Sequence, residues 1–68
     1  MTAKEILKQL GKLKSLYGYG ARMYMNDNEK APVFIREIYD QIIHHPESTR
    51  DHFGDELIEE IIRFCENN

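Results

Sequence analysis

The sequence predicts an all-α fold, a small bundle of three main helices at about residues 3–17, 32–45 and 55–66, with one or two short extra helical turns. Apolar residues recur every three to four positions in each of these segments, which is the period of an amphipathic helix. No segment of useful length alternates with period two, so a β-rich fold is not expected. The chain has 68 residues and no linker or repeat, which predicts a single helical domain over 1–68.

The first predicted helix, 3–17, begins at a capping box. The Thr2 hydroxyl is placed to accept from the Glu5 backbone N–H, and the Glu5 carboxylate reaches back. The apolar stripe covers about a third of the helix circumference, with Lys4, Lys8 and Lys12 opposite. Gly18 and Gly20 are expected to stop the helix. The stripe consists of Ile6, Leu7, Leu10, Leu13 and Tyr17.

An aromatic and Met-rich segment follows this helix. Residues 21–31 fit either a helical turn or a short extended piece, and Asn26-Asp27-Asn28 is typical of a turn. Tyr, Met and Arg are enriched in protein interfaces, where Met adapts its shape and Tyr covers a large area at low entropy cost. The cluster either closes one end of the bundle or binds a partner. The candidate partner-binding residues are Tyr17, Tyr19, Arg22, Met23 and Tyr24.

The second predicted helix, 32–45, opens at Pro32 and ends ahead of Pro46. Its apolar side chains spread over about half of the circumference, wider than the stripe of an ordinary surface helix. Such a helix contacts two neighbours, or one neighbour and a second subunit, so a homodimer through this face is a candidate. Ser48-Thr49-Arg50-Asp51 fits the cap of a short helical turn. The wide face consists of Phe34, Ile35, Ile38, Tyr39, Ile42 and Ile43.

The last predicted helix, 55–66, combines an apolar stripe with an acidic face. The stripe holds Leu57, Ile58, Ile61, Ile62 and Cys65. Acidic runs on a helix are usually solvated faces, and the alternative here is a patch that docks on a basic protein or mimics nucleic-acid phosphates. The carboxylates that complete the candidate partner-binding set, as a charged rim, are Glu56, Glu59 and Glu60.

Charge is sorted along the chain. Residues 1–30 carry six Lys and Arg against three Asp and Glu, a net +3, and residues 31–68 carry three against nine, a net −6, which sum to the −3 of the whole chain. This split either attracts one half of the fold to the other or presents opposite charges to a partner.

Several classes of function find no support. His44, His45 and His52 lack the pair spacing of a zinc site, so no metal or cofactor is expected. Cys65, on the apolar stripe, is expected to be a buried thiol without an activating base, so an enzyme is not expected. As the lone cysteine, it also fits a reducing compartment, and no apolar run approaches the roughly 18 residues of a membrane span, which together predict a cytoplasmic location.

Nucleic acid is not expected as a partner. Lys4, Lys8 and Lys12 with the tyrosines have the mix of cations and aromatics that binds single strands. However, three lysines make a weak electrostatic footprint, and the chain is acidic, with a pI of about 5.5.

From Pro32 onward the chain resembles the theta subunit of bacterial DNA polymerase III and its phage relative, which are small helical accessory proteins that bind the proofreading subunit. The resemblance is carried by Pro32-Val33, Pro46-Glu47, Arg50, Phe53 and Leu57-Ile58. The two prolines stand three residues further apart here than in that family. The resemblance implies a polymerase-accessory role and transfers no binding residue.

Together these observations predict a non-catalytic protein–protein interaction module, a small regulator, inhibitor or accessory subunit of bacterial or phage type, whose partner is another protein. The alternatives are a nucleic-acid-associated accessory protein similar to the theta subunit, or a self-associating structural protein.

Overall fold

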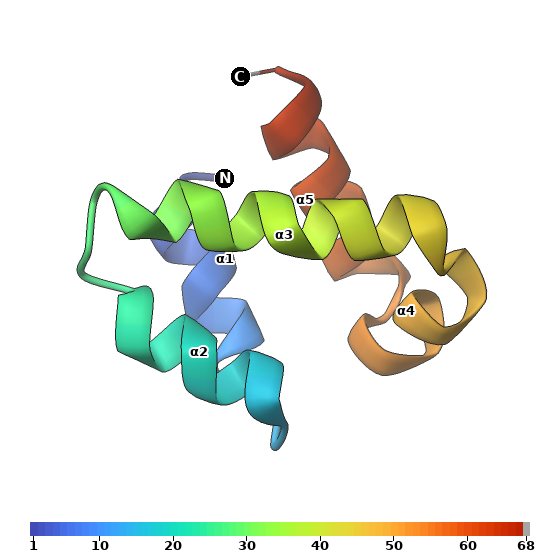
Figure 1. Cartoon of the computed structure of the whole chain (residues 1–68), viewed down its shortest axis with the longest axis horizontal. Coiled ribbons are helices and arrows are strands. Elements are labelled where there is room, and N and C mark those ends of the chain that lie inside the picture. The colour runs from blue at the N-terminus through green and yellow to red at the C-terminus, as the bar shows by residue number, and fades with distance from the viewer. Residues whose placement is uncertain (68) are drawn as a thin grey trace.

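The computed structural model describes residues 1–67, which contain five helices joined by short connections (Figure 1). They are α1 (Ala3–Leu10), α2 (Leu16–Tyr24), α3 (Lys30–His44), α4 (Pro46–Phe53) and α5 (Asp55–Glu66). No strand occurs in these residues, so the all-α class is confirmed. The number of helices is higher than predicted, because the first predicted helix divides into two and the expected short turn is a full helix.

The predicted helix 3–17 is wrong in its continuity, because α1 ends at Leu10 and residues 16–17 belong to α2. The capping box at Thr2 and Glu5 is present, and its hydrogen bonds from the Thr2 backbone and side chain lower the pKa of Glu5. At the other end Gly11 caps α1, with its N–H donating to the Leu7 carbonyl at 2.8 Å. The side chain of Ser15 then accepts from the Gly18 N–H and starts α2. A new N-cap therefore replaces the continuous helix.

Gly18 and Gly20 lie inside α2 and do not end it, which corrects a second expectation. Gly18 is buried where α2 passes over the end of α1, and a Cβ there would overlap the Leu13 carbonyl group. A Cβ on Gly20 would lie 2.7 Å from Cε1 of Phe34. Both glycines are thus sites of close packing between α2 and its neighbours.

The remaining helices match or extend the prediction. α3 begins two residues earlier than expected, after Asp27 accepts hydrogen bonds from the N–H groups of Glu29 and Lys30. It ends at His44, one residue before the predicted end at 45. In place of the short turn expected near Ser48, the structure has the eight-residue helix α4. This helix begins at Pro46, a residue that is well tolerated in the first turn of a helix. Gly54, with a φ of 84° and a ψ of 154°, separates α4 from α5, whose range is as predicted.

The core lies where α1, α3 and α5 meet. α3 crosses in front of α1 and α5 in Figure 1 and contacts all four other helices, while α1 also packs on α2 and α5. Burying each large side chain contributes about 1.5–3 kcal/mol to the free energy of unfolding. The large side chains with less than 2% exposure are Ile6, Leu7, Leu10, Ile35, Ile38, Ile58 and Ile61.

The wide apolar face of α3 is covered mainly by the chain's own helices. Ile35, Ile38 and Ile42 are buried, whereas Ile43 near the end of α3 stays 56% exposed. The face therefore serves several intramolecular neighbours. No helix in residues 1–67 combines the length and apolar character needed to cross a membrane.

Candidate functional site

The five candidate residues between 17 and 24 all lie on α2, but they divide between its two sides. Tyr17 faces inward, with its ring edge-on to Phe53 at 5.1 Å and to His52 at 5.6 Å between centroids. Tyr24 packs at 5.8 Å from the Phe34 ring, with Lys30 Nζ 5.9 Å from its centroid. These two tyrosines close the bundle around α2.

Arg22 has an intramolecular partner. Its Nη1 donates a hydrogen bond to the Gly11 carbonyl oxygen, and its Cγ lies 3.1 Å from where a Cβ on Gly11 would stand. A cation at this point also complements the negative end of the α1 dipole. Arg22 therefore ties the end of α1 to α2.

The outer face of α2 carries three large apolar side chains that remain in solvent. Leu16 is 87% exposed, Tyr19 59% and Met23 54%. They stand at i, i+3 and i+7, so they share one side of the helix, and we call them the α2 outer stripe. Tyr19 and Met23 were predicted as candidates, whereas Leu16 was missed. The three-residue spacing between Leu16 and Tyr19 could have indicated a shared helix face. That inference requires knowing that a new helix begins at Leu16.

The three acidic candidates lie on α5. Glu60 is 3.7 Å from the N-terminal amine and accepts from Arg63 at 2.9 Å. Glu56 and Glu59 are exposed and have no ion pair in residues 1–67. Asp55, beside them, pairs with Arg50 at 3.0 Å. The acidic face is thus only partly neutralised within the molecule.

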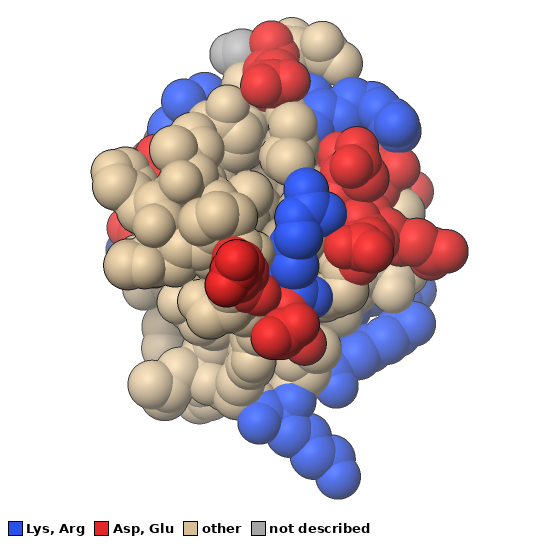
Figure 2. Space-filling view, turned by 90° about the vertical axis from the view of Figure 1, so that its right-hand side faces the viewer, with Lys and Arg blue, Asp and Glu red and all other residues tan. Residues whose placement is uncertain are grey.

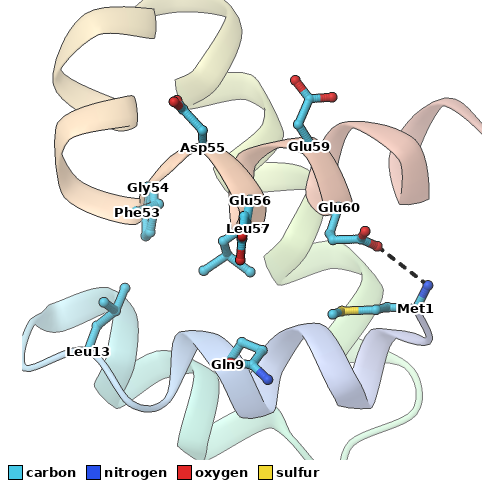
Figure 3. Close-up of a pocket in the computed structure, with 10 residues that line it drawn as sticks. All are labelled: Met1, Gln9, Leu13, Phe53, Gly54, Asp55, Glu56, Leu57, Glu59 and Glu60. Carbon is cyan, nitrogen blue, oxygen red and sulfur yellow. Dashed lines mark ion pairs between the residues drawn. The ribbon is translucent and has the colours of Figure 1, made fainter.

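Between α1 and α5 runs a groove of about 740 Å³, which we call the acidic groove (Figure 3). Met1, Gln9 and Leu13 line it from the side of α1, with Phe53, Gly54 and Leu57 opposite. In Figure 3 the side chains of Glu56, Leu57 and Glu60 point from α5 toward α1, whereas those of Asp55 and Glu59 point away from α1. The groove combines an apolar floor with a carboxylate rim. No Lys or Arg is among the residues that line the groove. Its acidic lining residues are Asp55, Glu56, Glu59 and Glu60.

The structure does not bring the two parts of the candidate set together. α2 packs on α1 and α3, whereas α5 packs on α1, α3 and α4. The acidic residues therefore border the acidic groove and not the α2 outer stripe. The chain has two separate candidate surfaces.

The lysines of residues 1–30 do not form ion pairs with the carboxylates of residues 31–67. Within residues 1–67 no lysine forms an ion pair, and the one ion pair between the halves joins the N-terminal amine to Glu60. Figure 2 shows acidic side chains gathered toward the right edge of the face that carries α4, with basic side chains above and below them. Most of the charge is left for solvent or for a partner.

The residues weighed for catalysis and metal binding lie apart. His52 Nε2 is 3.2 Å from Ser15 Oγ, which also accepts from the Gly18 N–H, so this contact links α4 to the start of α2. Cys65 is buried, and this burial raises the pKa of its thiol. Within the described residues, no three His, Cys, Asp or Glu side chains are arranged to hold a metal ion.

Comparison with known proteins adds no relative to this description. No protein-family model matches the chain, and neither a curated protein nor a solved structure gives a significant match.

Proposed function

We propose that this chain is a non-catalytic protein-interaction module, a small regulator, inhibitor or accessory subunit that binds another protein through the outer face of α2. The observation that carries the proposal is the α2 outer stripe, in which Leu16, Tyr19 and Met23 are each more than half exposed on one side of a helix. Burying these side chains against a partner would remove apolar surface from water, which favours association.

The composition of α2 supports binding of a protein. Its only charged residue is Arg22, whose guanidinium already binds the Gly11 carbonyl. The stripe itself therefore lacks the Lys and Glu side chains that protein interfaces avoid. The backbone under the stripe is preformed and packed on α1 and α3, so less ordering is required when a partner binds. The surrounding charges would steer the encounter more than they add affinity.

The test is a double substitution, Tyr19→Ala with Met23→Ala. Affinity capture from the native cell, with mass spectrometry, would identify the partner, and calorimetric titration would give its affinity. We expect the double variant to weaken binding by at least about thirtyfold, because two hot-spot side chains are truncated. The circular dichroism should stay helical, because both side chains are mainly exposed.

The matched control is Val33→Ala with Ile43→Ala, which truncates two exposed apolar side chains of α3 instead. This control should leave affinity within about twofold of the wild type, since scattered exposed apolar residues are ordinary. Unchanged affinity in the α2 variant, or an equal loss in the control, would show that the α2 outer stripe is not the binding surface.

A homodimer through the wide face of α3 stays a separate proposal. Beyond the side chains that the chain's own helices cover, Val33 and Ile43 are the large apolar residues of α3 that remain more than half exposed. Equilibrium sedimentation at increasing protein concentration decides it, since a monomer throughout would exclude the dimer.

A further inference from the structure

We propose that the acidic groove between α1 and α5 binds a basic amphipathic helix of a partner protein. This site is distinct from the α2 outer stripe and does not depend on the proposed function. It pairs an apolar floor with a rim of carboxylates, so the segment that fits it carries large apolar side chains on one side and lysine or arginine beside them.

The floor provides the apolar contact. Phe53 is buried, while Leu13 and Leu57 are partly buried and pack against the core from opposite sides of the groove. Its volume of about 740 Å³ lies in the range of pockets that take up ligand groups, roughly 300–1,000 Å³. A groove between two helices suits a third helix that inserts residues at i, i+3, i+4 and i+7.

The rim sets the charge of that helix. Four carboxylates line the groove. Glu60 pairs with Arg63 and with the N-terminal amine, and Asp55 pairs with Arg50, which leaves Glu56 and Glu59 without an ion pair in residues 1–67. Asp55 and Glu59, and likewise Glu56 and Glu60, stand four residues apart on α5, where like charges repel. A cationic partner would relieve this repulsion, and the apolar floor beneath strengthens its attraction to the rim.

A second copy of this chain does not supply the required helix. Its basic residues Lys4, Lys8 and Lys12 lie on one side of α1 and just after it, and all three are exposed. The large apolar residues of α1, which a groove would need as anchors, are fully buried in the core. The α2 outer stripe of a second copy is exposed, but the only charged residue of α2, Arg22, already binds the Gly11 carbonyl, so α2 presents no free cation to the rim. We therefore infer that the occupant is a segment of another protein.

The experiment is a fluorescence anisotropy titration of the whole chain with a labelled peptide of about 15 residues, the length at which an isolated helix becomes marginally stable. The peptide contains only leucine and lysine, with leucine at i, i+3, i+4 and i+7. A second peptide has the same composition with the leucines scattered. The variant is Glu56→Gln, and its matched control is Glu47→Gln. Both glutamates are exposed, are the second residue of their helix and are free of ion pairs in residues 1–67, and both variants raise the net charge by one.

We expect the patterned peptide to bind more tightly than the scattered one. The rim variant should weaken that binding by roughly three- to fivefold, and the control by less than about 1.5-fold, since one rim charge makes a modest contribution. In an NMR titration of the wild-type chain, the amides of Gln9, Leu13 and residues 55–60 should shift. The Tyr19→Ala, Met23→Ala variant should bind the peptide as the wild type does, which separates this site from the α2 outer stripe.

Three results would overturn the inference. Equal loss in the rim variant and its control would mean that net charge alone attracts the peptide. Equal binding of the two peptides would remove the role of the apolar floor. Amide shifts confined to α2 would place the peptide on the other surface.

Discussion

Replacing Gly18 by alanine should destabilise the fold, although alanine is the better helix former. Gly18 lies inside α2 and is buried against the turn that joins α1 to α2. A Cβ at this position would overlap the Leu13 carbonyl oxygen, approach its carbonyl carbon to 2.9 Å and the Leu10 oxygen to 3.3 Å. These neighbours are backbone atoms, so they cannot move aside as a flexible side chain would.

The size of the effect follows from two opposing contributions. Alanine in place of glycine favours a helix interior by about 1 kcal/mol. Forcing extra volume into a packed site typically costs about 1–3 kcal/mol, and a contact with backbone belongs at the upper end. We therefore expect a net loss of about 2 kcal/mol in the free energy of unfolding. For a domain of this size that corresponds to a decrease in Tm of about 8–16 °C.

Thermal and urea unfolding followed by circular dichroism would measure this change. The control is Gly11→Ala, because Gly11 has an ordinary helical φ of −64° and its nearest neighbour, Arg22 Cγ, belongs to a flexible side chain. This control should stay within about 1 kcal/mol of the wild type. If Gly18→Ala were as stable as Gly11→Ala, or more stable, the close approach of α2 to the α1–α2 turn would be refuted.

Three further predictions concern single residues. Gly54→Ala should lower the free energy of unfolding by about 1–3 kcal/mol in urea melts, because a φ of 84° with a ψ of 154° is almost restricted to glycine. The pKa of Tyr39 is raised by burial and, second, by the nearby Glu66 carboxylate. This carboxylate accepts a hydrogen bond from the Tyr39 hydroxyl at 3.3 Å. Because the folded pKa exceeds the unfolded value, this phenol stabilises the fold below about pH 10, and the contribution is lost as pH rises through the folded pKa. Tyr39→Phe should remove that alkaline step from a plot of unfolding free energy against pH, and a persisting step would assign it elsewhere. Cys65 should react with a thiol reagent far more slowly in the folded chain than in denaturant, since it is buried and its thiol pKa is raised; equal rates would show an accessible thiol.

The sequence predicted those features of the fold that depend on local pattern. The capping box at Thr2 and the range of α5 follow from the identities and spacing of neighbouring residues, and both are confirmed. The break between α1 and α2 was missed because Leu13 and Tyr17 continue the apolar period of Ile6 and Leu10, and both still pack against the core. Periodicity alone cannot distinguish one helix from two that keep the same phase.

The remaining differences depend on tertiary contacts. Gly18 and Gly20 were interpreted as helix stops from their intrinsic preferences, but their role is set by the Leu13 carbonyl and the Phe34 ring. Similarly, Glu56, Glu59 and Glu60 were predicted as the charged rim of the partner-binding set, whereas the acidic groove that they line is formed because α1 lies beside α5. The sequence of a single helix does not determine which other helices pack against it.

The packing of α1 on α5 also has a consequence for how the chain folds. Packing α1 on α5 closes a loop of roughly 50 residues, which costs about 2 kcal/mol more in chain entropy than closing the short turn between α1 and α2. The α1–α2 pair can therefore assemble early, whereas the part of α1 that packs on α5 is covered only when α5 docks. We therefore expect docking of α1 on α5 to be a late, non-local step in folding. A chain ending before Gly54 would retain helical propensity but lack a closed core.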